Sequence, residues 1–121
     1  MDIPCTRRNP KERRAYVDIK LTRDAEKLAT ALYKSYLEKR ESGQLKHESK
    51  LFYPEKVWKQ YFPKENEADF EETLNEFLRA FPCKRYVDGE YVLCDAFIIY
   101  MENRFKNGLK DVISFLTQFI P

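Results

Sequence analysis

The chain of 121 residues contains few of the residue types on which catalysis and cofactor binding commonly depend. Its three glycines, Gly43, Gly89 and Gly108, stand singly, so no phosphate-binding loop or dinucleotide-binding motif can be built from them. Its one histidine, His47, lies in a polar connector and would have to support a catalytic triad or a histidine metal site alone. We therefore expect no enzyme activity, no catalytic residue and no cofactor.

Cysteine and long apolar runs are also scarce. The three cysteines, Cys5, Cys83 and Cys94, show no Cys-x-x-Cys spacing, which argues against a zinc site and predicts no bound metal. No stretch reaches the ~18 apolar residues that a membrane span needs. The N-terminus lacks the apolar segment of a secretory signal. We therefore expect a cytoplasmic protein without a membrane contact, in which the thiols are reduced.

Charge is distributed unevenly, although the formal net charge is only +2. Residues 1–20 contain six lysines and arginines against three acids, whereas residues 64–80 contain six acids against two basic residues. We interpret residues 1–14 as a basic flexible arm and residues 15–121 as a single domain. The high aromatic content of this chain is sufficient for one ordinary core.

Apolar residues at spacings of three and four predict three helices in the first two thirds of the chain. Thr22 is the expected N-cap of the first helix, and Gly43 suits a left-handed C-terminal cap. Pro54 fits the first position of a short second helix, and Asn66 opens the third. A short strand is possible at residues 51–53. The three predicted helices span residues 22–42, 54–62 and 66–81.

A β-hairpin is predicted over residues 83–94. Asp88-Gly89 is a strong signal for a two-residue type I′ turn, because both positions of that turn need positive φ. Centring the turn there places Cys83 opposite Cys94, at a separation compatible with either a disulfide or two packed reduced thiols. The predicted pairs are Val87–Glu90, Tyr86–Tyr91, Arg85–Val92, Lys84–Leu93 and Cys83–Cys94.

A long C-terminal helix is predicted over residues 95–120. It is apolar around much of its circumference, which is typical of a helix that is deeply buried or shared with a partner. Asn107-Gly108 costs ~1 kcal/mol relative to alanine and marks a possible bend or break. We expect a homodimer through this helix, with simple packing onto the first helix as the alternative. The predicted dimer interface consists of Leu109, Val112, Leu116 and Phe119.

The predicted order of helix, possible short strand, short helix, helix and hairpin resembles that of the winged helix-turn-helix superfamily. In addition, the stretch from LTRDAEKLATALY to ENRFKNGLKDVISFLTQFIP, about residues 20–121, resembles small uncharacterised proteins of Firmicute bacteria and their prophages. These resemblances imply a mainly α fold with a small β-hairpin, winged-helix-like in its arrangement. They imply no established activity, because fold alone does not give function.

In a helix-turn-helix domain, helix 66–81 would lie in the major groove of DNA. Asn75 on its exposed side can pair with adenine and Arg79 with guanine. The glutamates on the same side, Glu71, Glu72 and Glu76, would repel phosphates, so either cations elsewhere supply most of the affinity or this helix does not read DNA. A basic arm can enter a minor groove. The candidate phosphate contacts are Lys56, Lys59, Lys84 and Arg85, together with Arg7, Arg8, Arg13 and Arg14 in the arm.

The sequence therefore predicts a small DNA-binding, transcription-regulator-like protein without catalytic activity, with double-stranded DNA as its partner. The alternative is a protein–protein interaction module or adaptor of a bacterial mobile element. That module would use the acidic helix 66–81 against a basic partner surface. Salt-dependent binding to duplex DNA separates the two hypotheses, because only phosphate contacts release counterions.

Overall fold

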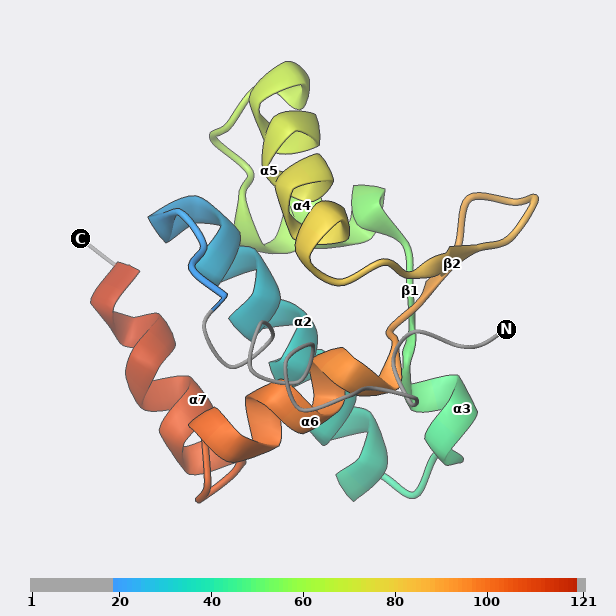
Figure 1. The fold of residues 1–121 in the computed structure, drawn as a ribbon, viewed down its shortest axis with the longest axis vertical. Coiled ribbons are helices and arrows are strands. Elements are labelled where there is room, and N and C mark those ends of the chain that lie inside the picture. The colour runs from blue at the N-terminus through green and yellow to red at the C-terminus, as the bar shows by residue number, and fades with distance from the viewer. Residues whose placement is uncertain (1–18, 120–121) are drawn as a thin grey trace.

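The structure, a computed structural model, describes residues 19–119, without the side chain of Phe119. This part of the chain is mainly helical and carries a small three-stranded antiparallel sheet (Figure 1). In chain order the elements are α2 (Arg23–Glu41), α3 (Lys46–Ser49), β1 (Leu51–Phe52), α4 (Pro54–Tyr61), α5 (Glu67–Ala80), β2 (Lys84–Arg85), β3 (Tyr91–Val92), α6 (Asp95–Arg104), α7 (Leu109–Leu116) and the 3-10 helix η1 (Thr117–Phe119).

The first helix begins and ends where its capping residues predict. The Thr22 hydroxyl oxygen accepts a hydrogen bond from the Ala25 N–H at 3.3 Å, which satisfies one of the unpaired donors at the start of α2. At the other end, Gly43 has a φ of +95°. This conformation lets the Gln44 N–H donate to the Lys39 carbonyl at 3.1 Å, as in a Schellman motif. The predicted first helix is therefore confirmed.

The second and third predicted helices are also confirmed. Pro54 is the first residue of α4, where its missing N–H has no consequence. The Asn66 side chain accepts from the Asp69 N–H at 2.8 Å and so caps α5. The short helix α3, which contains His47, lies in the stretch that we interpreted as a polar connector. Its four residues carry too little apolar periodicity to be detected in the sequence.

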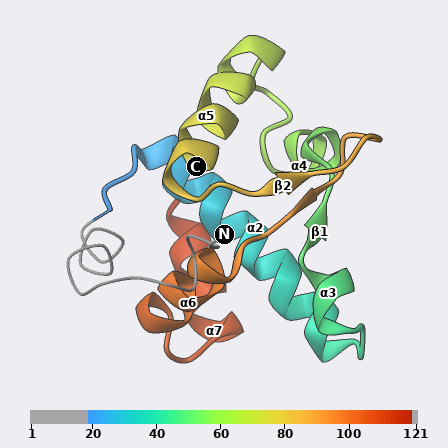
Figure 2. The same ribbon diagram turned by 45° about the vertical axis from the view of Figure 1, so that its right-hand side comes forward.

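β3 is the central strand of the sheet, and it pairs with β1 on one side and with β2 on the other. Its partners on β1 are Leu51 opposite Val92 and Phe52 opposite Tyr91. The strand that the sequence allowed at residues 51–53 is thus present. It joins the hairpin to the helical body, and β2, β3 and their loop, hereafter the wing, project away from the helices (Figures 1 and 2).

The hairpin lies where it was predicted, but its predicted register is wrong by one residue. Arg85, not Tyr86, is the partner of Tyr91. The turn contains three residues instead of two, because the Tyr86 N–H donates to the Glu90 carbonyl at 2.7 Å. Only Gly89 adopts positive φ, at +93°, which is typical of a three-residue hairpin loop.

This shift changes the environment of the cysteines. Continuing the observed register places Cys83 opposite Leu93, so the prediction that Cys83 and Cys94 are direct cross-strand partners is also wrong. The extra residue in the turn shifts the pairing by one position. Because strand residues alternate between the two faces of a sheet, this shift moves each side chain to the face opposite to the predicted one.

The prediction of one helix over residues 95–120 is wrong as well. α6 ends before Phe105, and α7 begins after Gly108, which has a φ of +65°. The Asn107-Gly108 signal therefore marks a true break, and α7 returns alongside α2 (Figure 1). The break allows Phe115 on α7 to pack edge-on against Phe105, with ring centroids 5.7 Å apart. The break thus lets α7 bury Val112 against the helical body, which removes apolar surface from water.

Aromatic rings from three helices meet at Phe97, which is completely buried on α6. Its ring packs edge-on against Phe77 and Phe81, at centroid distances of 5.1 and 5.3 Å, and against Tyr33 at 6.4 Å. Edge-on arrangements place the positive edge of one ring against the negative face of another. Phe97 therefore joins α2, α5 and α6 in one core.

We predict that Phe97→Ala lowers the free energy of unfolding by about 3–5 kcal/mol, because it leaves a cavity between three helices. Urea unfolding followed by circular dichroism measures the change. Ile99→Ala is the matched control, since Ile99 lies on the same helix and is 53% exposed. A loss for Phe97→Ala no larger than that of the control would contradict the central position of this ring.

Candidate nucleic-acid interface

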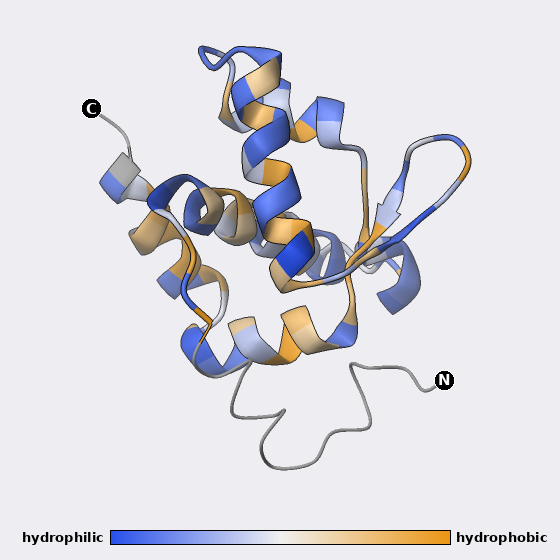
Figure 3. Ribbon diagram, turned by 45° about the horizontal axis from the view of Figure 1, so that its top comes forward, coloured by the Kyte–Doolittle hydropathy of each residue, from blue (hydrophilic) through white to orange (hydrophobic). Residues whose placement is uncertain are grey.

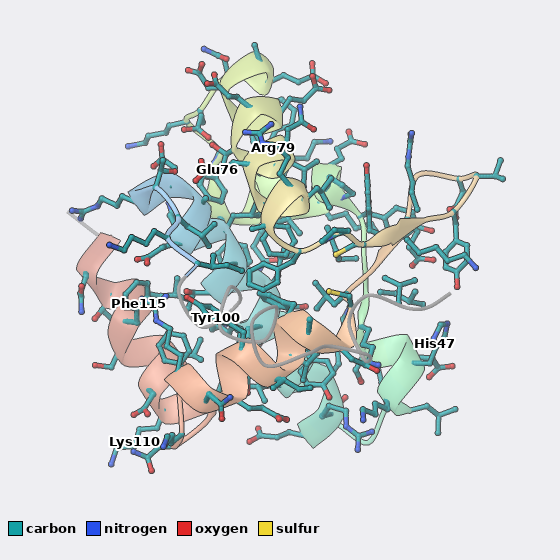
Figure 4. The ribbon with its side chains drawn as sticks, in the orientation of Figure 1. His47, Glu76, Arg79, Tyr100, Lys110 and Phe115 are labelled. Atoms are coloured by element: carbon teal, nitrogen blue, oxygen red, sulfur yellow. The ribbon has the colours of Figure 1, made fainter. Side chains whose placement is uncertain are left out.

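The exposed face of α5 carries the two residues that we expected to read bases. Asn75 and Arg79 are both exposed, and Arg79 points outward from the helix (Figure 4). Glu71 and Glu72 are exposed on the same helix, and among residues 19–119 neither forms an ion pair. Hydrophilic and hydrophobic residues alternate along α5, as expected for a helix with one buried and one exposed side (Figure 3). Its uncompensated carboxylates oppose the approach of phosphates.

Glu76 does not belong to this exposed face, which corrects the sequence-based interpretation. Its carboxylate accepts the Thr22 N–H at 2.8 Å and the Thr22 hydroxyl at 2.7 Å. A carboxylate at the start of α2 interacts favourably with the positive end of the helix dipole. Glu76 thus connects α5 to α2, and no sequence signal indicates a contact between residues 54 positions apart.

The basic residues predicted on the hairpin lie over tyrosine rings of the same sheet. The Lys84 ammonium lies 5.2 Å from the centroid of the Tyr86 ring, and the Arg85 guanidinium 6.0 Å from that of Tyr91. Such cation–π contacts hold long side chains in place while their charges stay accessible. Both Lys84 and Arg85 are exposed, so the structure places two oriented cations on one strand.

The two basic residues predicted on α4 differ from each other. Lys56 lies 5.1 Å from the Tyr53 ring, at the edge of the sheet. Lys59 instead pairs with Glu55 at 3.0 Å on the exposed side of the same helix. A phosphate would have to compete with Glu55 for Lys59, so Lys56 is the better candidate for a phosphate contact.

Lys39 is a cation of this region that sequence reasoning missed. Its ammonium donates to the Leu51 carbonyl at 2.7 Å, at the edge of β1. Burial lowers the pKa of Lys39, an effect that nearby Glu90 opposes and nearby Lys56 reinforces. The charges of Lys56 and Glu90 therefore both act on Lys39 beside the sheet. We assigned no role to Lys39 from the sequence.

The wing loop is held by Asp88. One carboxylate oxygen accepts the Glu90 N–H at 3.0 Å, and the other accepts the Tyr53 hydroxyl at 2.9 Å. The Glu90 amide, followed by the Tyr53 hydroxyl, lowers the pKa of Asp88. The loop is thus tied to the segment between β1 and α4. Val87 beside Asp88 has a fully exposed side chain.

The structure does not describe the predicted basic arm, which contains Arg7, Arg8, Arg13 and Arg14. His47, for which we expected no catalytic role, lies on α3, away from Glu76 and Arg79 on α5 (Figure 4).

Of the predicted dimer residues, Val112 is completely buried within its own chain, Leu109 and Leu116 are half-buried, and the Phe119 side chain lies outside the described part. Val112 packs in the same core as α2, which was the alternative to dimerisation. The homodimer stays a prediction.

Residues 19–119 contain no group of three or more histidine, cysteine, aspartate or glutamate side chains that could hold a metal ion. None of the helices in that range combines the length and the apolar character needed to cross a bilayer. Comparisons of the chain with protein-family models, curated proteins and solved structures give no match. The functional reasoning therefore rests on the geometry of the surface described above.

Glu65, just before α5, offers a test of the acidic surroundings of this helix. Its Oε1 atom is buried and has no hydrogen-bond partner among the described residues. Burial, followed by the charges of Asp24 and Asp69, raises the pKa of Glu65 above its ordinary value of 4.5, while Lys27 opposes the shift. Ionisation of Glu65 is therefore less favourable in the folded chain than in the unfolded one.

We predict that Glu65→Gln is more stable than the wild type at neutral pH, and that the difference disappears as the pH falls below 4.5. At low pH the wild-type carboxyl is protonated and resembles the amide, so the two proteins are equally stable. As the pH rises through the raised pKa of Glu65, the carboxyl must ionise in its buried site, and the wild type loses stability. Urea unfolding midpoints across this pH range measure the effect. The exposed Glu71→Gln serves as control, and a pH-independent difference for Glu65→Gln would contradict the assignment.

Proposed function

We propose that this protein is a small DNA-binding, transcription-regulator-like protein of winged-helix-like arrangement, without catalytic activity. The order α2, α3, β1, α4, α5, β2, β3 supports the proposal, because it places a short helix and then a longer helix directly before a two-stranded wing. The central position of β3 in the sheet supports it further, since pairing with β1 fixes the wing to the helical body. Neither feature specifies a ligand, which must come from the chemistry of the surface.

One observation carries the proposal: three cations on or beside the sheet are each oriented by a tyrosine ring. Lys56, Lys84 and Arg85 each lie over a tyrosine ring. Contacts of lysine and arginine with phosphates dominate the affinity of proteins for nucleic acids. Orientation of these side chains before binding reduces the conformational entropy that binding would otherwise cost. A polyanion is the partner that fits such a surface.

A second candidate function is supported by α5. Glu67, Glu71 and Glu72 are exposed and form no ion pair among residues 19–119. An exposed acidic helix suits a basic surface on another protein, because complementary charge directs association. In this alternative the chain is a protein–protein interaction module or an adaptor of a bacterial mobile element, and the wing cations have no phosphate partner.

We predict that the full chain binds a random-sequence DNA duplex and that its affinity falls steeply with salt. Replacing Lys56, Lys84 and Arg85 by alanine should make the negative slope of log K against log salt shallower by about 2 to 3, since each phosphate contact contributes about 0.9 to its magnitude. Fluorescence anisotropy over a salt series measures both quantities. Additional replacement of Arg7, Arg8, Arg13 and Arg14 by alanine should reduce the slope further if the arm takes part.

Lys110→Ala is the matched control for this experiment. Lys110 lies near the start of α7, well away from the wing (Figure 4), so its removal should leave the salt slope almost unchanged. Absence of duplex binding at about 50 mM salt would reject the DNA-binding proposal and favour the protein-interaction module.

A further inference from the structure

We infer that the wing, and not α5, is the element that enters DNA, and that it enters the major groove with Val87 against the methyl groups of thymine. The inference rests on the proposed function and specifies which surface carries it. It differs from the usual arrangement of helix-turn-helix domains, in which a recognition helix occupies the groove. Charge, shape and the chemistry of the wing tip each support it.

Charge separates the two candidate elements. The exposed face of α5 presents Glu67, Glu71 and Glu72 against the single cation Arg79. A helix inserted into the major groove has phosphates on both sides, so these three carboxylates would be brought close to them without compensation.

Around the wing the chain carries four cations and two carboxylates, apart from the ion pair of Lys50 with Asp95 at 2.6 Å. Asp88 accepts two hydrogen bonds, and the charge of Glu90 acts on Lys39. The lysine and arginine side chains around the wing therefore outnumber the carboxylates that an approaching phosphate would meet. The cations of this region are Lys39, Lys56, Lys84 and Arg85.

The shape of the wing fits a groove. A two-stranded β-ribbon fits the major groove, which is about 12 Å wide, more readily than the minor groove, which is about 6 Å wide. The wing projects from the body (Figures 1 and 2). Its loop is fixed internally by the Tyr86–Glu90 hydrogen bond and is tied to Tyr53 through Asp88. The projection is thus preorganised before it meets DNA.

The tip of the wing is apolar. Val87 is one of only a few large hydrophobic side chains that are exposed in residues 19–119, and no other is exposed to the same extent. Tyr86 and Asp88 hold it outward by their backbone and side-chain hydrogen bonds. The 5-methyl group of thymine is the apolar group that bases present in the major groove, and the minor groove has no equivalent.

Replacement of thymine by uracil removes this methyl group and leaves the minor groove unchanged, so it tests the inference directly. We expect the full chain to bind an alternating A·T DNA duplex about fourfold more tightly than the same DNA duplex with uracil in place of thymine (A·U). Burial of about one methyl group accounts for a difference of this size. Val87→Ala should bind both duplexes with nearly equal affinity. Ile99→Ala, which removes an exposed apolar side chain from α6, should keep the full difference.

A second pair of variants tests the two elements against each other. Lys84→Ala/Arg85→Ala on the wing should weaken duplex binding at least tenfold, whereas Asn75→Ala/Arg79→Ala on α5 should change it less than threefold. Unfolding transitions of all variants verify that they fold.

Equal affinity of the wild type for the A·T and A·U duplexes, or a larger loss from the α5 variant than from the wing variant, would overturn the inference and leave DNA binding intact. If neither duplex binds at low salt, the proposed function itself fails, and the inference fails with it.

Discussion

Pairing of β3 with β1 is the constraint on which the position of the wing depends. Without it, β2 and β3 would be an isolated hairpin, which is marginally stable in water. The partners Leu51–Val92 and Phe52–Tyr91 join the hairpin to the helical body, and the Phe52 and Tyr91 rings stack with centroids 5.5 Å apart. This contact places Arg85, which lies over Tyr91, on the same face of the sheet. The proposed interface therefore follows from two short strand pairings.

The helical body supplies the rigidity that these pairings require. Aromatic rings of α2, α5 and α6 meet around Phe97, and the break before α7 adds Phe115 to the same core. Arg104 extends this packing, because its guanidinium lies 5.0 Å from the Phe115 ring and bonds to Glu26 on α2 at 3.3 Å. α5 is thus held on several sides and presents its acidic face in one direction, while the cations lie on the sheet.

Local signals in the sequence predicted the helices better than the contacts between them. The Thr22 and Asn66 caps and the Asp88-Gly89 turn are short-range features, and each forms where it was expected. The turn length was wrong because Asp-Gly is compatible with both two- and three-residue loops, and the choice here coincides with a hydrogen bond from distant Tyr53. The sequence-based interpretation placed Glu76 on the wrong surface because its partner, Thr22, caps another helix far away in the sequence. Tertiary contacts of this kind leave no periodic pattern.

The register of β2 against β3 decides which side chains share a face, and nuclear Overhauser effects between Cα protons measure it most directly. Arg85–Tyr91 lies one residue beyond the hydrogen-bonded Tyr86–Glu90 pair, so it is a pair of the closely spaced, non-hydrogen-bonded type. The account predicts a strong effect between the Cα protons of Arg85 and Tyr91. A strong effect between Tyr86 and Tyr91 instead would show the two-residue turn, reverse the faces of the wing and contradict the account.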